Sequence, residues 1–182
     1  RIEFKSDLRG LDFLSFTEDG KYLSFGFERD KWLRIWDVET RRTIISLNER
    51  VRYWAFAPGN HRVAFALENG QDHEIRFYDP ANPNTILKRY SGKHFPGAQA
   101  ESKELMAFSS GGGEISLFAS ATGELIDTVH GHGSSVFGLG FSPDGRRLIS
   151  SAGGREAMKL WDVSTRQELL TLAGTGSILV RA

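Results

Sequence analysis

The 182-residue sequence predicts an all-β protein made of four consecutive four-stranded antiparallel units. The main observation is an internal repeat, in which an aromatic residue ends a short apolar segment at positions 36, 78, 118 and 161. A repeat period between about 20 and 50 residues is typical of folds that stack one small unit several times. In addition, no window of about a dozen residues has the apolar spacing of an amphipathic helix.

The repeat has two elements that keep the same register. The first is a five-residue segment around the aromatic position, found at Leu33–Asp37, Ile75–Asp79, Ile115–Ala119 and Met158–Asp162. The second is a turn segment that begins with phenylalanine, found at Phe16–Gly20, Phe56–Asn60 and Phe141–Gly145. The third unit has only Ala98–Ser102 at this place, so it is the most diverged of the four.

Each unit is expected to contain four short strands, and the last unit shows them most clearly. Its strands are expected at residues 135–141, 146–152, 157–161 and 167–172. Asp144-Gly145 and Gly153-Gly154 lie between them, and glycine readily adopts the positive φ of tight turns. Strands that recur every 8–12 residues or so, separated by such turns, are typical of an antiparallel all-β fold.

Three features of these units resemble the WD40 repeat. They are the period, the Trp161-Asp162 ending of the third strand, and a Gly131-His132 pair whose histidine lies 29 residues before Trp161. The resemblance implies a β-propeller, in which four-stranded blades surround a central channel. The fourth unit looks especially like bacterial WD40 proteins. Blades are then expected at about residues 7–47, 48–90, 91–130 and 131–173, with partial strands at 1–4 and 177–182.

Four blades are fewer than the seven or eight with which WD40 propellers usually close. Because an open ring leaves unpaired strand edges, the resemblance implies a partial, open propeller fragment of a larger protein. The sequence also starts at Arg1, with no methionine and no signal-peptide pattern, which we interpret as a missing N-terminus.

The resemblance further implies a buried hydrogen-bonded set made of a histidine, a serine, a tryptophan and a turn aspartate. In the fourth unit His132, Ser150 and Trp161 occupy the first three places, and Arg155 stands near the place of the aspartate. His130 and His132 also invite comparison with a metal site. A zinc site needs three or four ligands, however, and no further donor cluster is evident. We therefore expect a structural role for His132 and no metal.

The first two units keep less of this set. Asp30 and Trp36 fit it in the first unit, and Asp72 fits the turn position in the second. Phe25 and Phe65 stand at the serine places. Apolar packing is therefore expected to hold these two blades together.

A candidate partner-binding surface is expected where the first strands of successive blades begin, because partners of WD40 domains often dock there beside the channel. Alignment of the units places aromatic and arginine side chains at this position, and such side chains are frequent anchors of protein interfaces. The candidate residues are Phe13, Arg52, Tyr53, Phe95 and Phe137. The alternative is that these rings pack between neighbouring blades.

The composition argues against several classes of function. The 23 basic and 23 acidic residues cancel, which disfavours the basic face of a nucleic-acid-binding protein. The absence of cysteine removes disulfides, thiolate metal sites and a cysteine nucleophile, and it is compatible with a cytoplasmic protein. No apolar run reaches the roughly 20 residues of a membrane helix, so no membrane partner is expected.

No paired catalytic carboxylates, nucleophile with a base, or cofactor motif stands out. The glycine-rich segment from Ser109 to Gly113 lacks the ending of a phosphate-binding loop, so a turn is expected there. The predicted function is therefore a protein–protein interaction scaffold or sensor module of a larger multidomain protein, with no enzyme activity and no cofactor. Its partner would be a protein or peptide. The alternative is a propeller that forms or gates the active site of an enzyme.

Overall fold

The computed structural model describes residues 13–27, 32–70, 72–93, 97–153 and 158–174. These ranges contain strands and turns but no helix, which confirms the all-β prediction. The strands are β1 (Phe13–Phe16), β2 (Tyr22–Phe27), β3 (Trp32–Asp37), β4 (Arg42–Leu47), β5 (Val51–Phe56), β6 (Val63–Asn69), β7 (Asp72–Tyr78), β8 (Ile86–Lys93), β9 (Gln99–Glu101), β10 (Leu105–Ser109), β11 (Glu114–Ala119), β12 (Leu125–His130), β13 (Val136–Phe141), β14 (Arg147–Ala152), β15 (Met158–Asp162) and β16 (Glu168–Leu172).

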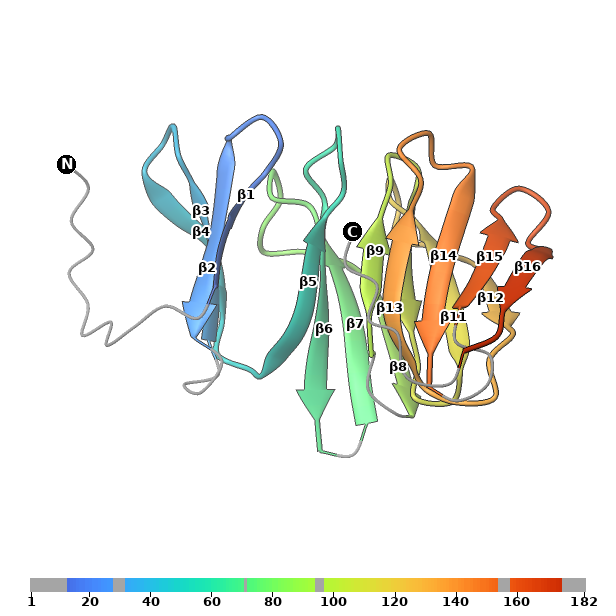
Figure 1. Ribbon diagram of the computed structural model, residues 1–182. Coiled ribbons are helices and arrows are strands. Elements are labelled where there is room, and N and C mark those ends of the chain that lie inside the picture. Colours follow the sequence, from blue (N-terminus) through green and yellow to red (C-terminus); the bar gives the residue numbers. More distant parts are fainter. Residues whose placement is uncertain (1–12, 28–31, 71, 94–96, 154–157, 175–182) are drawn as a thin grey trace.

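The strands form four separate four-stranded sheets, β1–β4, β5–β8, β9–β12 and β13–β16. Within each sheet the strands follow chain order and every neighbouring pair is antiparallel. The first strands of neighbouring sheets lie close to one another, since β9 contacts both β5 and β13. Figure 1 shows the sheets standing side by side in an arc. This arrangement confirms the predicted succession of four four-stranded antiparallel blades.

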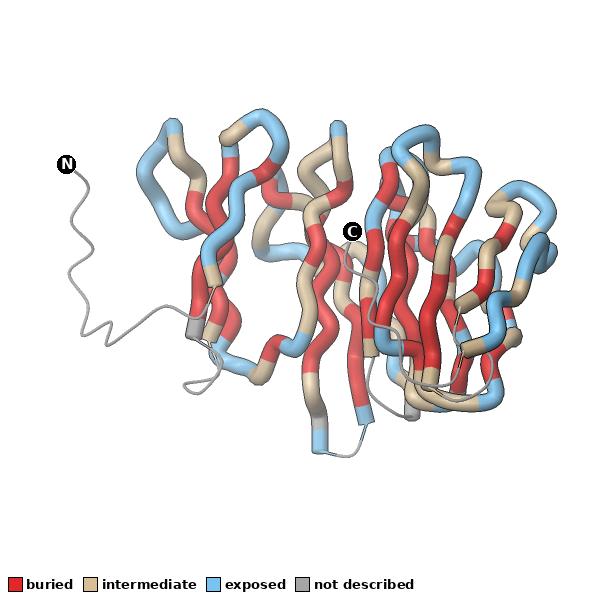
Figure 2. Tube along the Cα trace, viewed as in Figure 1, coloured by how far each residue is buried: buried red, intermediate tan, exposed pale blue. Residues whose placement is uncertain are grey.

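Three apolar clusters join successive sheets. Leu33 and Ile35 of the first sheet pack with Phe65 of the second. Phe77 of the second sheet packs on Phe118 of the third, and another cluster joins the third sheet to the fourth. Figure 2 shows the buried positions along the strands and the exposed positions mainly in the turns. Each sheet is thus stabilised by its neighbour, as expected for stacked repeats.

The turn after the first strand explains the recurring Asp-Gly pair. Asp19 Oδ1 accepts hydrogen bonds from Thr17 Oγ1 at 2.8 Å and from the backbone N–H of Lys21 at 3.1 Å. These bonds, that of Lys21 first, hold the pKa of Asp19 down at about 2. Gly20 has a φ of 72°, a conformation that costs glycine little because it has no Cβ. Asp144 makes the equivalent contacts in the fourth sheet.

Two boundaries need comment. β8 continues to Lys93, beyond the limit expected at about residue 90 for the second blade, because it pairs with the long strand β7 as far as Asp72. β9 has only 3 residues, in the unit that diverges most in sequence. The partial strands expected at residues 1–4 and 177–182 lie outside the described residues.

Candidate functional site

Two β-bulges lie near the beginnings of the first strands of the second and fourth sheets. In β5 the extra residue is Arg52, which has no partner in the register with β6. In β13 the extra residue is Phe137, which has no partner in the register with β14. A bulge bends its strand and changes the direction of the extra side chain. Both residues are exposed, Phe137 by 47%.

Arg52 brings positive charge to this end of the array. Its Nε donates a hydrogen bond to Glu68 Oε2 at 2.9 Å, and Glu68 also forms an ion pair with Arg50. The Glu68 carboxylate therefore contacts two guanidinium groups at the beginning of β5. The exposed ring of Phe137 lies at the corresponding position of β13. A cation and a ring, each on a rigid strand, form a surface suited to protein contact.

Two other predicted surface residues hold neighbouring sheets together. Phe13 lies against Trp54 of the second sheet, with 4.0 Å between ring centroids. Tyr53 packs with the cluster between the second and third sheets, and its hydroxyl donates to the carbonyl oxygen of Gly97 at 3.0 Å. Packing between blades, the alternative considered above, therefore describes the positions of both rings.

The candidates thus divide by one step in register. Tyr53 follows the bulge in β5, Phe13 stands at the equivalent position of β1, and both rings face the next sheet. Arg52 and Phe137 are themselves the bulged residues, and their side chains face solvent. Residue type does not indicate where a bulge lies. The sequence alone therefore does not distinguish the two exposed side chains from the two packed rings. Phe95 lies outside the described residues.

His132, Ser150 and Trp161 lie together in the fourth sheet. The Ser150 hydroxyl is 2.7 Å from His132 Nε2 and accepts a hydrogen bond from Trp161 Nε1 at 2.8 Å. All three side chains are buried. The glycine at position 131 is required here, because a Cβ on Gly131 would lie 2.0 Å from the Trp161 ring. The Ser150 hydroxyl thus links His132 to Trp161 within the fold, while Arg155 lies outside the described residues.

Ring pairs replace this polar set in the second and third sheets. Phe65 stands at the register position of Ser150 and contacts Tyr78 edge to face, with 5.5 Å between centroids. Phe108 and Phe118 make the same contact at 6.0 Å. An aromatic pair contributes about 0.5–1.5 kcal/mol beyond area burial, similar to the roughly 1 kcal/mol of a hydrogen bond. The ring pairs therefore stabilise their sheets about as much as the hydrogen-bonded set that they replace.

Asp72, the aspartate assigned to the second unit, does not complete such a set. Asp72 is exposed at the start of β7 and makes no side-chain hydrogen bond to another described residue, contrary to our expectation. The reason is that Phe65 occupies the place of the serine that an aspartate-linked set would need. Trp36 is buried in an apolar cluster with Phe25. Asp30 lies outside the described residues.

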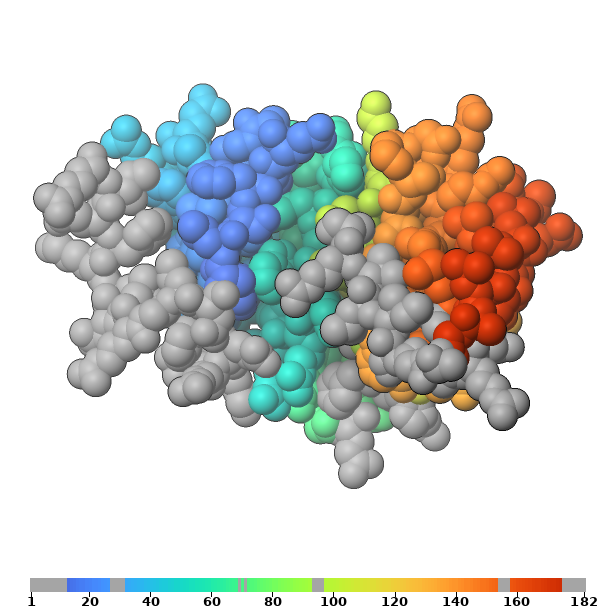
Figure 3. Space-filling model, viewed as in Figure 1, coloured from blue at the N-terminus to red at the C-terminus, as the bar shows by residue number. Residues whose placement is uncertain are grey.

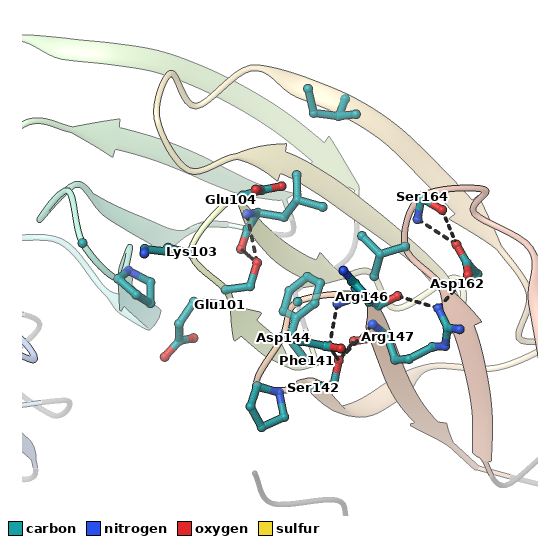
Figure 4. Close-up of a pocket in the computed structure, with 18 of the residues that line it drawn as sticks. Glu101, Lys103, Glu104, Phe141, Ser142, Asp144, Arg146, Arg147, Asp162 and Ser164 are labelled. Carbon is teal, nitrogen blue, oxygen red and sulfur yellow. Dashed lines mark hydrogen bonds and ion pairs between the residues drawn. The ribbon is translucent and has the colours of Figure 1, made fainter.

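An open cleft of about 1370 Å³ lies at the other ends of the first strands, beside the turns that follow them. Figure 4 shows Glu101, Lys103, Asp144, Arg147 and Asp162 around it. Arg147 forms an ion pair with Asp162 at 2.6 Å, and Asp144 is held by hydrogen bonds within its own turn. These charged groups therefore stabilise the turns that form the cleft.

Glu101 is unusual because it stands where the other sheets have phenylalanine. It pairs with Met106 in the same way that Phe16 pairs with Leu23 in the first sheet. The residue is partly exposed along the cleft. Protein atoms around its carboxyl exclude part of the surrounding water, and this partial desolvation raises its pKa. Protonation of Glu101 is therefore easier in the folded protein than in the unfolded chain.

Replacement of Glu101 by glutamine is expected to raise the melting temperature near neutral pH. Because its folded-state pKa is raised, Glu101 contributes its full stabilisation below the unfolded-state pKa of about 4.3. This stabilisation is lost as the pH rises through the folded-state pKa. Thermal melts of both proteins, near neutral pH and below that unfolded-state pKa, test this expectation. The two melting temperatures should converge in acid, and a constant difference would contradict the assignment.

Among the described residues, no group of three or more His, Cys, Asp or Glu side chains could hold a metal ion. His130 is exposed and pairs loosely with Glu114 at 3.5 Å, whereas His132 is buried against Ser150. The same ranges contain no helix long and apolar enough to cross a membrane.

Comparison with known proteins agrees with this geometry. The WD40 family model, described as "WD domain, G-beta repeat", matches residues 123–162. A chain in a structure described as "Crystal Structure of Mitotic Checkpoint Complex" superposes with a TM-score of 0.72, covering 91% of this chain and 52% of that chain at 17% identity. Residues 123–162 of this chain form a WD40 repeat, within a β-propeller fold. The matched WD40 segment includes β12 to β15 and ends at Asp162.

Curated relatives of this WD40 chain come from several kingdoms. Nuclear distribution protein PAC1 of Arthroderma otae is 27% identical over 161 residues, which cover 75% of this chain and 34% of the relative. Protein FIZZY-RELATED 3 of Arabidopsis thaliana is 26% identical over 169 residues, covering 89% and 34%. An uncharacterized WD repeat-containing protein of Synechocystis is 35% identical over 51 residues, covering 28% and 15%. The chain thus spans about a third of the length of the first two relatives.

Proposed function

We propose that this WD40 chain is a protein–protein interaction scaffold or sensor module of a larger multidomain protein of bacterial type. In this proposal, blades outside residues 1–182 complete the ring. Relatives that are longer than this chain support it, as does a structural neighbour that comes from a protein complex. The balanced charge favours a protein or peptide partner over nucleic acid.

The observation that carries the proposal is the pair of β-bulges. They project Arg52 and Phe137 into solvent near the beginnings of β5 and β13, the first strands of two sheets on either side of the third. Because β9 contacts both strands, β5 and β13 lie on either side of β9. A partner that docks there would meet an arginine and an aromatic ring, two of the residue types that dominate interface energetics. Phe13 and Tyr53 support this surface from within the fold.

The test uses the full-length protein as bait and identifies its partner by affinity purification. Arg52→Ala and Phe137→Ala are then measured for affinity to that partner. A loss of at least tenfold for each, equivalent to about 1.4 kcal/mol, is expected because anchor residues contribute several times more than their neighbours. Both residues are exposed, so the variants should remain folded.

Lys103→Ala is the matched control, because Lys103 lines the cleft at the opposite ends of the first strands. It should bind the partner as the parent does. Unchanged affinity of the folded Arg52→Ala, Phe137→Ala double variant would refute the proposed surface. If only Lys103→Ala weakened binding, the partner would dock at the cleft instead.

A further inference from the structure

The strand β9 carries polar side chains where the first strands of the other sheets carry large apolar ones. Residues two apart on a strand point to the same face, so Gln99 and Glu101 share one face of β9. The pairs that stand at the same register positions in the other sheets are Leu14 with Phe16, Trp54 with Phe56, and Leu139 with Phe141. The third sheet therefore departs from the repeat at two positions of one face.

This polar face of β9 points toward the second sheet. Gln99 Nε2 donates a hydrogen bond to the carbonyl oxygen of Trp54, whereas no described residue donates to the buried Oε1 of the same amide. Glu101 lines the cleft of about 1370 Å³ and also an adjoining cleft of about 880 Å³, beside Trp54 and Ala57. Among the described residues, its carboxylate has no hydrogen-bond donor and no ion-pair partner. Two acceptors on this face thus lack donors.

The other charged groups of the cleft do not neutralise Glu101. Arg147 pairs with Asp162 at 2.6 Å. The Lys103 side chain extends along the second sheet instead, since its Cε lies 3.6 Å from the place of a Cβ on Gly59. Figure 3 shows the residues after β9 (yellow-green) between those of the second sheet (teal) and of the fourth (orange), at the upper edge of the molecule. The cations described in this cleft therefore leave the Glu101 carboxylate without a counter-ion.

A carboxylate at this position carries a cost that the other sheets avoid. Phe141, its equivalent in the fourth sheet, packs against the apolar cluster between the third and fourth sheets. Glu101 instead stands in a partly desolvated place, which raises its pKa. Loss of water around a charge is unfavourable unless a group of opposite charge replaces it. A charged group held in this way within a cleft is typical of a functional site, and a positively charged group of a ligand would supply the absent partner.

We propose that this cleft binds a lysine or arginine side chain of an extended partner peptide, with Glu101 as its counter-ion. The cleft runs along turns of the second, third and fourth sheets, a length that suits a peptide better than a small ion. Ile126 and Phe141 also line it and offer apolar surface to the neighbouring residues of the peptide. The site goes beyond the proposed function, because it lies at the opposite ends of the first strands from Arg52 and Phe137.

Selection from a library of random dodecapeptides displayed on phage tests the proposal. The full-length protein is the target, and its Glu101→Phe variant removes peptides that bind elsewhere. Circular dichroism should show that this variant is folded, because phenylalanine is the residue of the other three sheets at this position. The recovered peptides should share a lysine or an arginine. In fluorescence anisotropy titrations, each synthetic peptide should bind Glu101→Gln at least tenfold more weakly than the parent, since the substitution keeps the shape and removes the charge.

Glu104→Gln is the matched control, because it removes the same charge from an exposed residue of the same cleft. The peptide affinity of this variant should stay within about twofold of the parent, as expected for an exposed carboxylate. On the peptide side, norleucine in place of the shared basic residue should weaken binding to the parent at least tenfold and hardly change binding to Glu101→Gln. Such coupling between the two substitutions identifies a direct contact.

Several results would overturn the proposal. The selection could recover no peptide or only peptides without a basic residue, the parent and Glu101→Gln could bind equally well, or Glu104→Gln could lose as much affinity as Glu101→Gln. Displacement of the bound peptide by spermidine at matched concentration would also overturn it, because the site would then belong to a small polycation. Arg52→Ala should bind the selected peptides like the parent, so that the result is independent of partner binding through Arg52 and Phe137.

Discussion

Replacing Phe77 by alanine is expected to lower the free energy of unfolding by about 3–5 kcal/mol, the usual cost of removing a buried ring. Phe77 is buried between the second and third sheets, with ring centroids 5.2 Å from Phe118 and 6.3 Å from Tyr90. The backbone of Gly123 also lies against the ring, because a Cβ there would come within 2.6 Å of it. The cavity left by the ring would therefore be enclosed on several sides, and neighbouring side chains could fill little of it. Urea denaturation followed by tryptophan fluorescence measures the change.

Phe137→Ala is the matched control, since it removes the same side chain from an exposed position. A change within about 0.5 kcal/mol is expected there, as for most surface substitutions. A change within about 0.5 kcal/mol for both substitutions would show that the contact between the second and third sheets contributes little to folding. A large loss for both would instead mean that Phe137 is part of the core, which would remove it from the proposed partner surface.

Replacing His132 by alanine is expected to cost about 1–3 kcal/mol and to leave metal content unchanged. The substitution removes one of two hydrogen-bond partners of the buried Ser150 hydroxyl. It also opens space beside the Trp161 ring, whose centroid lies 6.4 Å from that of His132. Thermal melts of parent and variant give the stability change, and elemental analysis gives the metal content. Stoichiometric zinc in the parent that disappears in the variant would contradict the structural role.

A double-mutant cycle with Ser150→Ala separates the shared hydrogen bond from simple loss of volume. Because the two side chains are in contact, the combined substitution should cost less than the sum of the single ones. Full additivity would indicate that the hydrogen bond contributes nothing measurable. Ser116→Ala is a suitable control, because this serine lies in another sheet and bonds only weakly to Thr128, at 3.4 Å.

The fourth sheet shows how far local sequence determines this fold. Its strands were expected at residues 135–141, 146–152, 157–161 and 167–172, and β13 to β16 agree within one residue at each end. The agreement arises because alternation of apolar residues and glycine turns act over a few neighbouring positions. The contact of His132 with Ser150 and Trp161 could be anticipated only through the WD40 resemblance, since these residues are far apart in the chain.

Features that depend on the neighbouring sheet could not be predicted in this way. The bulges at Arg52 and Phe137 depend on how each first strand pairs with the second, and one step in register exchanges a buried ring for an exposed one. The raised pKa of Glu101 likewise depends on the sheets beside it. Asp72 has the spacing of a structural aspartate. In its sheet, however, Phe65 stands where the fourth sheet has the buried serine of the hydrogen-bonded set.

The WD40 segment at residues 123–162 does not coincide with one sheet, because it joins the outer strand β12 of the third sheet to β13–β15 of the fourth. Loss of such a segment from a gene would leave β9–β11 directly before β16, which could then take the vacant outer place beside β11. Duplication of the same segment would likewise add the equivalent of one complete four-stranded blade. Blade number in such proteins is therefore free to change over evolution by single genetic steps that leave no sheet incomplete.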